Sequence, residues 1–304
     1  MATRRELSDR ARREYAERVE AHLRELARSE EAATKAALDS IGNIKDGLRS
    51  KLAGVKTIDG SWDVSRLPEL QNAVNEATAR LDASLTKSIQ RAQGAAYKDG
   101  ISAAIDPVQS AIRVVQPGFK IETGLPNVAL LQTLQAFGAD LVTEATADVR
   151  AGLTDAVKLG VIGVLRPYEV AEKIDELMGT RRKDGSLSSI SADAERIART
   201  EVGRAFVAAQ FEGAKAVAIA VPDLKKKWVA TSDARTRDSH AEADGQIVPL
   251  DEPFVISGRV GSIELMYPRD PSGPPEEVVS CRCSWVQERD DWAAPPPVDT
   301  IDAT

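Results

Sequence analysis

The sequence predicts an α+β protein, with a long α-helical N-terminal region followed by a small α+β module that has a mainly antiparallel sheet. Upstream of residue 160, apolar residues recur every three or four positions, which is typical of amphipathic helices. Aromatic residues make up 4% of the chain, and its apolar content relies on Ala, Leu and Val, which favours helices over a large sandwich. We expect long helices in residues 1–163, the module in 164–290, and a disordered Pro-rich acidic tail in 291–304.

The charge balance and the cysteine count exclude several classes of protein. Forty basic residues against 47 acidic ones give a formal charge of -7, which argues against a protein that mainly coats nucleic acid. Two cysteines in 304 residues argue against a disulfide framework and suit a reducing compartment. We expect no signal peptide and no membrane helix, because the first residues lack an apolar stretch and no apolar run approaches about 20 residues. The sequence therefore predicts a soluble protein made in the cytosol.

Three long helices are expected first, at residues 4–55, about 67–105 and about 127–159. The second should end before Pro107, because proline disfavours the helical conformation in the residue before it. Residues 106–126 are then a connection. The apolar stripes of these helices must be buried against each other, against the downstream module or against a partner.

Shorter elements follow. Pro167 is expected in the first turn of a helix over 166–178, where its missing N–H is tolerated. Gly179 ends that helix, and a solvated basic loop follows at 180–186. Ser189 or Ser191 is expected to cap a further helix that reaches about residue 218.

The stretch from Trp228 to Trp285 is the most distinctive part of the chain. It begins with a strand-like run at 225–231, after which Ser232 or Asp233 is expected to cap a short helix. Gly245 suits the left-handed position after that helix. On the helix, four side chains could form one polar cluster: Thr236, Arg237, His240 and Asp244. Two interpretations stay open. In the first, Asp233 is only a helix cap and His240 is only a structural residue that forms hydrogen bonds. In the second, both form a metal or catalytic site with the cysteines.

Strand alternation places Cys281, Cys283 and Trp285 on one face, together with Val279. Buried cysteines behave as small hydrophobic residues, so core packing is the favoured interpretation. A disulfide within Cys-x-Cys would be strained. Zinc needs about four ligands, and His240 with the two cysteines supplies three, which makes zinc the weaker alternative.

Seven short motifs occur in a fixed order across this region. They are Ile-Ala-Arg-Thr-Glu (197–201), Lys-Trp (227–228), Asp-Ala-Arg-Thr-Arg-Asp-Ser-His (233–240), Ala-Asp-Gly (243–245), Pro-Phe (253–254), Tyr-Pro (267–268) and Cys-Arg-Cys (281–283). Their order resembles the phage Mu F-type minor head protein family, also called the SPP1-type head morphogenesis family. The resemblance covers about residues 165–288.

The resemblance implies a minor head protein of a tailed phage or prophage, associated with the portal and acting in head morphogenesis. A part in genome packaging or ejection is left open. The implied partner is the portal protein, with major capsid or scaffold proteins and packaged DNA as further candidates, and with no membrane and no small-molecule substrate. The protein would be made in the host cytoplasm and reside in the capsid interior near the portal vertex. Some members carry a toxin or transferase domain after this module, and we expect none here.

We therefore expect a structural protein and not an enzyme, with no catalytic residue, no metal and no cofactor. The candidate binding residues are Asp233, Arg235, Arg237 and His240, and the candidate structural residues are Trp228, Cys281, Arg282, Cys283 and Trp285. The alternative is a metal-dependent hydrolase or nuclease built on Asp233, His240, Cys281 and Cys283. A DNA-binding module is a third hypothesis, which the net acidity and the sparse aromatic residues disfavour.

Overall fold

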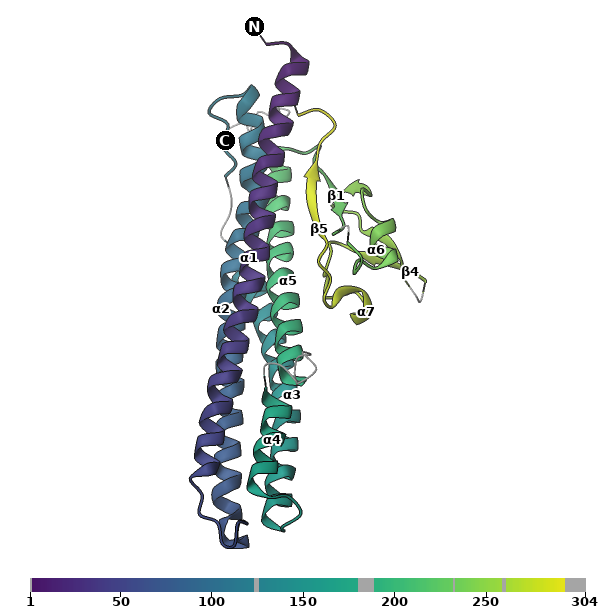
Figure 1. Ribbon diagram of the computed structural model, residues 1–304. Coiled ribbons are helices and arrows are strands. Elements are labelled where there is room, and N and C mark those ends of the chain that lie inside the picture. The colour runs from purple at the N-terminus through teal and green to yellow at the C-terminus, as the bar shows by residue number, and fades with distance from the viewer. Residues whose placement is uncertain (1, 123–125, 180–188, 232, 259–260, 293–304) are drawn as a thin grey trace. The chain divides into compact units, whose positions relative to one another are not determined.

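The computed structural model describes residues 2–122, 126–179, 189–231, 233–258 and 261–292 (Figure 1). Long helices are followed by short antiparallel strands, which confirms the predicted α+β class. The expected basic loop and the expected tail beyond residue 292 lie outside the described residues. Among the described helices, none combines the length and the apolar character that crossing a membrane requires.

The helical elements match most of the predicted ranges. They are α1 (Arg4–Ala53), the 3-10 turn η1 (Val64–Arg66), α2 (Leu67–Val115), α3 (Val128–Val161), α4 (Pro167–Met178) and α5 (Ser189–Ala220). Pro167 occupies the first turn of α4, as predicted, and Gly179 is the C-cap. Ser191 lies inside α5 and therefore does not cap it, while a cap at Ser189 stays a prediction. Its hydroxyl donates to the carbonyl oxygen of Gly179, 3.1 Å away.

Pro107 lies inside α2, which corrects the prediction that this helix ends near residue 105. The first half of the expected connection is therefore helical. After Pro107, the side chains of Val108, Ala111 and Ile112 are fully buried. Burying one Val and one Ile contributes about 3–6 kcal/mol, which offsets the roughly 3 kcal/mol that an interior proline costs.

The small module contains two antiparallel sheets. In the first, β1 (Lys225–Val229) lies between β2 (Ile247–Pro249) and β5 (Ser284–Glu288), with Trp228 directly opposite Trp285. In the second, β3 (Phe254–Gly258) pairs with β4 (Gly261–Leu265). The short helix α6 (Asp238–Glu242) follows β1 in the chain, and α7 (Pro275–Val278) precedes β5 (Figure 1). Both β1 and β5 are shorter than the strand-like runs in the sequence.

Contacts group the chain into two compact units that do not follow sequence order. Unit 1 contains residues 1–29, 93–132 and 202–304, and unit 2 contains residues 30–92 and 133–201. The four long helices each contribute residues to both units. The division at residue 163 that the sequence suggested stays a prediction.

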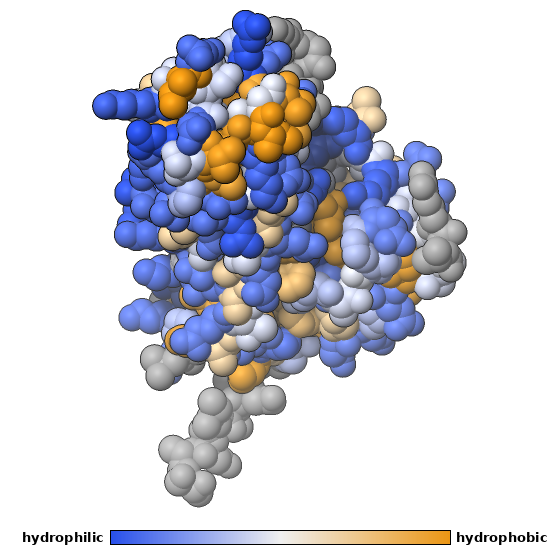
Figure 2. Space-filling view, turned by 90° about the horizontal axis from the view of Figure 1, so that it is seen from below, coloured by the Kyte–Doolittle hydropathy of each residue, from blue (hydrophilic) through white to orange (hydrophobic). Residues whose placement is uncertain are grey.

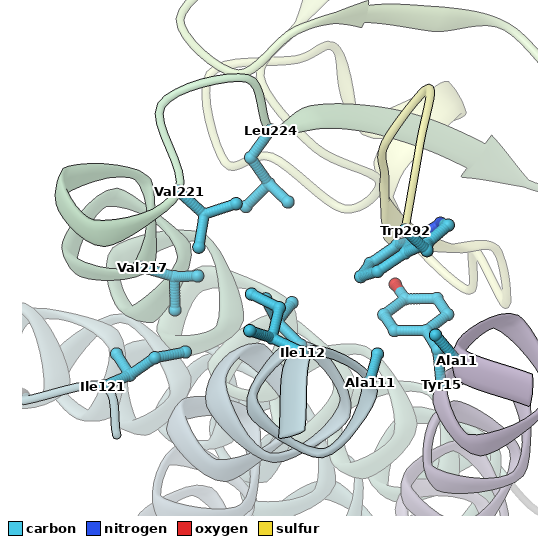
Figure 3. Packing of buried hydrophobic residues seen from close by; sticks show 10 residues of the cluster. Ala11, Tyr15, Ala111, Ile112, Ile121, Val217, Val221, Leu224 and Trp292 are labelled. Carbon is cyan, nitrogen blue, oxygen red and sulfur yellow. The ribbon is translucent and has the colours of Figure 1, made fainter. Parts of the chain in front are cut away.

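The core of unit 1 connects its helices to the end of the sheet module. Figure 3 shows the rings of Tyr15 and Trp292 against each other, with centroids 4.5 Å apart. The Tyr15 hydroxyl donates to the carbonyl oxygen of Gln287 (2.6 Å), and the Gln287 side chain donates to the carbonyl oxygen of Ala104 (2.7 Å). β5 is thereby held against α1 and α2. The cluster contains Ala11, Tyr15, Val108, Ala111, Ile112, Ile121, Val217, Val221, Leu224 and Trp292.

Within unit 1, α2 and α5 approach each other at two glycines. A Cβ on Gly100 would overlap the carbonyl oxygen of Phe206, and a Cβ on Gly213 would lie 2.8 Å from the Cβ of Ala104. Any side chain at Gly100 would push backbone aside, so the close approach requires glycine there.

Unit 2 exposes apolar side chains where the α1–α2 and α3–α4 turns meet. Trp62 is buried there, and a Cβ on Gly160 would lie 3.0 Å from its ring. Figure 2 looks at this end of the helices and shows hydrophobic side chains gathered on it. We call five exposed residues of these two turns and the start of α4 the apolar tip; they are 60–67% exposed: Ile58, Val64, Ile162, Val164 and Tyr168.

Candidate functional site

Three side chains of metal-ligand type converge in the interior of unit 1. Nδ1 of His240, on α6, lies 3.5 Å from Sγ of Cys281 and 3.4 Å from Sγ of Cys283. The ligand atoms of the three residues all lie within 4.8 Å of one another. Each residue is at most 3% exposed. We call these three residues the His–Cys cluster.

The pKa values of the two thiols in the cluster are shifted in opposite directions. The hydrogen bond from Cys283 holds the pKa of Cys281 well below its usual range, against the opposing effect of burial. The pKa of Cys283 is raised, because its proton is held by Cys281 and because the thiol is buried. Cys281 is therefore the sulfur that gives up its proton first, and Cys281 and Cys283 titrate as a pair.

A buried carboxylate lies on the other side of the histidine ring. Oε2 of Glu277, on α7, is 3.2 Å from Nε2 of His240, and Glu277 is 4% exposed. The hydroxyl of Ser239 donates to the same carboxylate oxygen, at 3.0 Å. Nε2 forms no hydrogen bond within the described residues, although this carboxylate lies within ion-pair distance, and Nδ1 on the other side of the ring faces the two sulfurs.

Backbone geometry brings α6, α7 and the cysteines together. The guanidinium of Arg237 donates to the carbonyl oxygen of Val279 at 2.7 Å, which fixes the start of α6 to the end of α7. Ser280 then adopts a positive φ of 56°, a left-handed conformation that turns the chain into Cys281. A non-glycine residue in this region is strained, so the turn depends on the surrounding contacts.

An aromatic ring packs beside the histidine of the cluster. The Trp228 ring is edge-on to His240, with centroids 5.4 Å apart, and edge-on to Phe254 at 5.3 Å. Trp228 and Phe254 are fully buried. The cluster therefore lies in an apolar surrounding, where interactions between polar groups are stronger than in water.

Asp233 does not cap a helix, which corrects the prediction. In the described residues α6 begins only at Asp238, with Arg237 as its N-cap. Asp233 Oδ1 instead accepts the N–H of Arg235 at 2.9 Å, and both carboxylate oxygens accept from Arg282. The Arg282 guanidinium holds the pKa of Asp233 well below its usual range. The carboxylate is thereby committed to an ion pair at the surface.

The four predicted binding residues do not form one polar cluster. His240 faces the sulfurs, Arg237 faces the carbonyl oxygens of α7, Asp233 binds Arg282, and Arg235 is exposed. The expected helical neighbours do not arise, because α6 is too short to include both Arg237 and Asp244. A role for these residues in binding stays a prediction.

The predicted strand face is partly correct. Cys281, Cys283 and Trp285 are buried as the alternation indicated, but Ser284 is also buried, because β5 begins only there. Arg282 points to the opposite side and meets Asp233. Trp228 and Trp285 both lie in the core.

Sequence reasoning missed several buried charged residues, among them Lys226 and Glu277. Lys226 lies two positions before Trp228, so strand alternation could have placed it on the same inward face. Its ammonium donates to the carbonyl oxygen of Met266 at 2.7 Å and lies 5.0 Å from the Phe211 and Phe254 rings. Burial lowers the pKa of Lys226 to about 8. No sequence pattern indicated that Glu277 is buried beside His240, because the two residues lie on separate short helices, α7 and α6.

A comparison with protein families finds a match to the model described as "Phage Mu protein F like protein" over residues 149–286. The matched range contains the C-terminal part of α3, all of α4 and α5, and every residue of the His–Cys cluster.

Two curated relatives are also similar to parts of the chain. One is the "NAD(+)--arginine ADP-ribosyltransferase EFV" of Enterococcus faecalis, 42% identical over 95 residues, which are 30% of this chain and 18% of that protein. Another is "Uncharacterized protein YqbB" of Bacillus subtilis, 34% identical over 140 residues, which are 41% of this chain and 43% of that protein. The chain thus spans less than half the length of either relative. No solved structure matches the chain.

Proposed function

We propose that the chain is a minor head protein that binds the portal, because its residues 149–286 match the model of the phage Mu protein F-like family, whose members act in phage head morphogenesis. The family match is the observation that carries this proposal. On this proposal the protein resides in the virion, inside the capsid near the portal vertex. Major capsid or scaffold proteins and packaged DNA are further candidate partners, and a part in packaging or ejection follows from a position beside the portal.

We propose a structural and not an enzymatic role. The hydrolase or nuclease alternative needed Asp233 beside His240 and the cysteines, but Asp233 is bound by Arg282. The similarity to the Enterococcus faecalis transferase spans 18% of that protein, so we do not carry its named activity to this chain.

The apolar tip of unit 2 supports the proposal of a portal contact. Contiguous exposed apolar side chains are uncommon on isolated proteins and mark surfaces that bind other proteins. The tip is built from two turns held together by the packing of Trp62 against Gly160, so it presents a defined surface. We propose that these residues contact the portal protein.

The test is co-purification with the portal protein of the same phage. Replacing Ile162 and Val164 by Ser removes two of the most exposed apolar side chains of the tip, and the variant should no longer co-purify with portal. The matched control replaces Ile219 and Val255 by Ser, which are 86% and 47% exposed in unit 1. Portal binding that survives the tip variant, or that both double variants lose equally, would contradict the proposed contact.

Truncating the N-terminal helix would be a poor test. Residues 1–60 include Tyr15, which packs against Trp292, and Ile41 and Leu48, which are buried in unit 2. Their loss would expose the cores of both units and so confuse unfolding with lost binding.

A further inference from the structure

We propose that His240, Cys281 and Cys283 bind one Zn²⁺ ion that holds the small sheet module together. This inference does not depend on the proposed role in the phage head. It concerns only the interior of unit 1.

The spacing of the three ligand atoms fits a tetrahedral zinc ion. Zn–S bonds of ~2.3 Å and Zn–N bonds of ~2.0 Å at tetrahedral angles put sulfur and nitrogen about 3.5 Å apart. The two observed separations between sulfur and Nδ1 are 3.5 Å and 3.4 Å. Two thiolates and one imidazole are also ligand types that zinc prefers.

Core packing alone explains this cluster less well. A neutral imidazole has one acceptor nitrogen with one lone pair, so it can accept a hydrogen bond from only one thiol at a time. Here two sulfurs converge on the same Nδ1, and the opposite ring nitrogen faces a buried glutamate. Burying four titratable groups together is costly unless they are paired or coordinate a metal. A cation between the two sulfurs and Nδ1 would contact all three ligand atoms at once.

Glu277 has the place of an outer carboxylate in a zinc site. Histidines that bind zinc through one nitrogen commonly face a carboxylate with the other, which fixes the ring orientation and increases its basicity. Glu277 Oε2 lies 3.2 Å from Nε2 and is itself held by the hydroxyl of Ser239. Glu277 therefore lies where such an outer carboxylate is expected, on the side of the ring opposite to the two sulfurs.

The position of the ligands indicates a structural role for the metal. His240 precedes Cys281 by 41 residues and Cys283 by 43, and the intervening chain contains β2, β3, β4 and α7. A metal would thus close a loop that encloses most of the sheet module. Three protein ligands leave one tetrahedral position for a water or another donor.

The first experiment measures metal content in the full chain, expressed with added zinc and purified under reducing conditions. We expect about one zinc ion per chain in the wild type, and its loss in His240→Gln and in Cys283→Ser. The chain has two histidines, so His22→Gln is a matched control for the same substitution outside the site. Cobalt added to the metal-free wild type should give a sulfur-to-cobalt charge-transfer band and the visible spectrum of a tetrahedral site.

The second experiment uses the wild type alone and so does not depend on whether a variant folds. The two cysteines should react slowly with an alkylating reagent, and a strong chelator should increase that rate at least tenfold while the helical signal persists. Equal alkylation rates with and without chelator would overturn the proposal. So would a wild type that takes up neither zinc nor cobalt, or a His22→Gln variant that loses zinc as His240→Gln does.

Discussion

The His–Cys cluster of unit 1 and the apolar tip of unit 2 depart from the usual distribution of side chains in opposite directions. At the cluster, titratable groups are withdrawn from water. At the tip, large apolar groups remain in water. Burying polar groups costs free energy unless they have partners. Burying an exposed apolar patch against another surface would be favourable. We therefore propose a partner from outside this chain for each region, a cation for the cluster and a protein surface for the tip.

The largest effect on stability should come from removing the indole ring of Trp228, which packs beside His240. Trp228→Ala removes a fully buried indole beside His240 and Phe254, and should reduce the free energy of unfolding by about 3–5 kcal/mol. Denaturant titration followed by circular dichroism measures this loss. Tyr168→Ala at the tip is the contrasting truncation, because its side chain is exposed. Similar losses for the two variants would remove the contrast between the regions.

A smaller effect should come from the carboxylate beside the histidine. Glu277→Gln keeps the shape and removes the charge, and should weaken zinc binding by about 10–100-fold. Competition with a coloured zinc chelator measures the affinity. Glu276→Gln is the matched control, since Glu276 is the exposed neighbour on α7. Equal affinities for the two variants would mean that Glu277 does not orient the ring.

The buried lysine predicts a dependence of stability on pH. The folded pKa of Lys226 is about 8, below the ordinary value of 10.5, because burial disfavours its charge. Between these pH values the unfolded chain binds more protons than the folded chain, so Lys226 makes stability increase with pH in this window. The Lys226→Met variant should lack this increase. The measurement is the unfolding free energy of the wild type and of the variant against pH, and the difference between the two curves should increase from pH 8 to 10.5. A difference curve that is flat from pH 8 to 10.5 would be inconsistent with this account.

The smallest effect on stability is expected at the tip. Replacing Ile162 and Val164 by Ser should change the free energy of unfolding by about 0.5 kcal/mol or less, because surface substitutions cost little. Ile41→Ser, at a fully buried position of the same unit, should be far more destabilising. Thermal unfolding of both variants measures the difference. A tip variant as unstable as Ile41→Ser would show that these side chains support the fold and are not free to bind a partner.

The sequence predicted the elements whose signals are local. The helical stripes located α1, α3 and α5 to within a few residues, and the fixed φ of Pro167 located the start of α4. Strand alternation correctly indicated that Cys281 and Cys283 are buried. The same local rules failed at Pro107, because the burial of Val108 and Ile112 outweighs the cost of the proline.

The site could be predicted only in part, because its contacts join distant segments. The sequence offered His240 and the cysteines as three ligands, but no spacing rule reports that residues 41 positions apart meet at 3.5 Å. It also could not show that Arg282 withdraws Asp233 from that group. Glu277 was missed for the same reason, since it reaches His240 only through the approach of α6 and α7.

The glycine contact between α2 and α5 has a mechanical consequence. Sliding one helix along the other by a single turn, about 5.4 Å, would bring the side chain of Tyr97 or Ala104 to the place that only Gly100 fits. Within unit 1, α2 and α5 can therefore pack in only one axial register, and the contact resists sliding along the helix axes. Force applied along α5 would therefore pass to α2 at this contact.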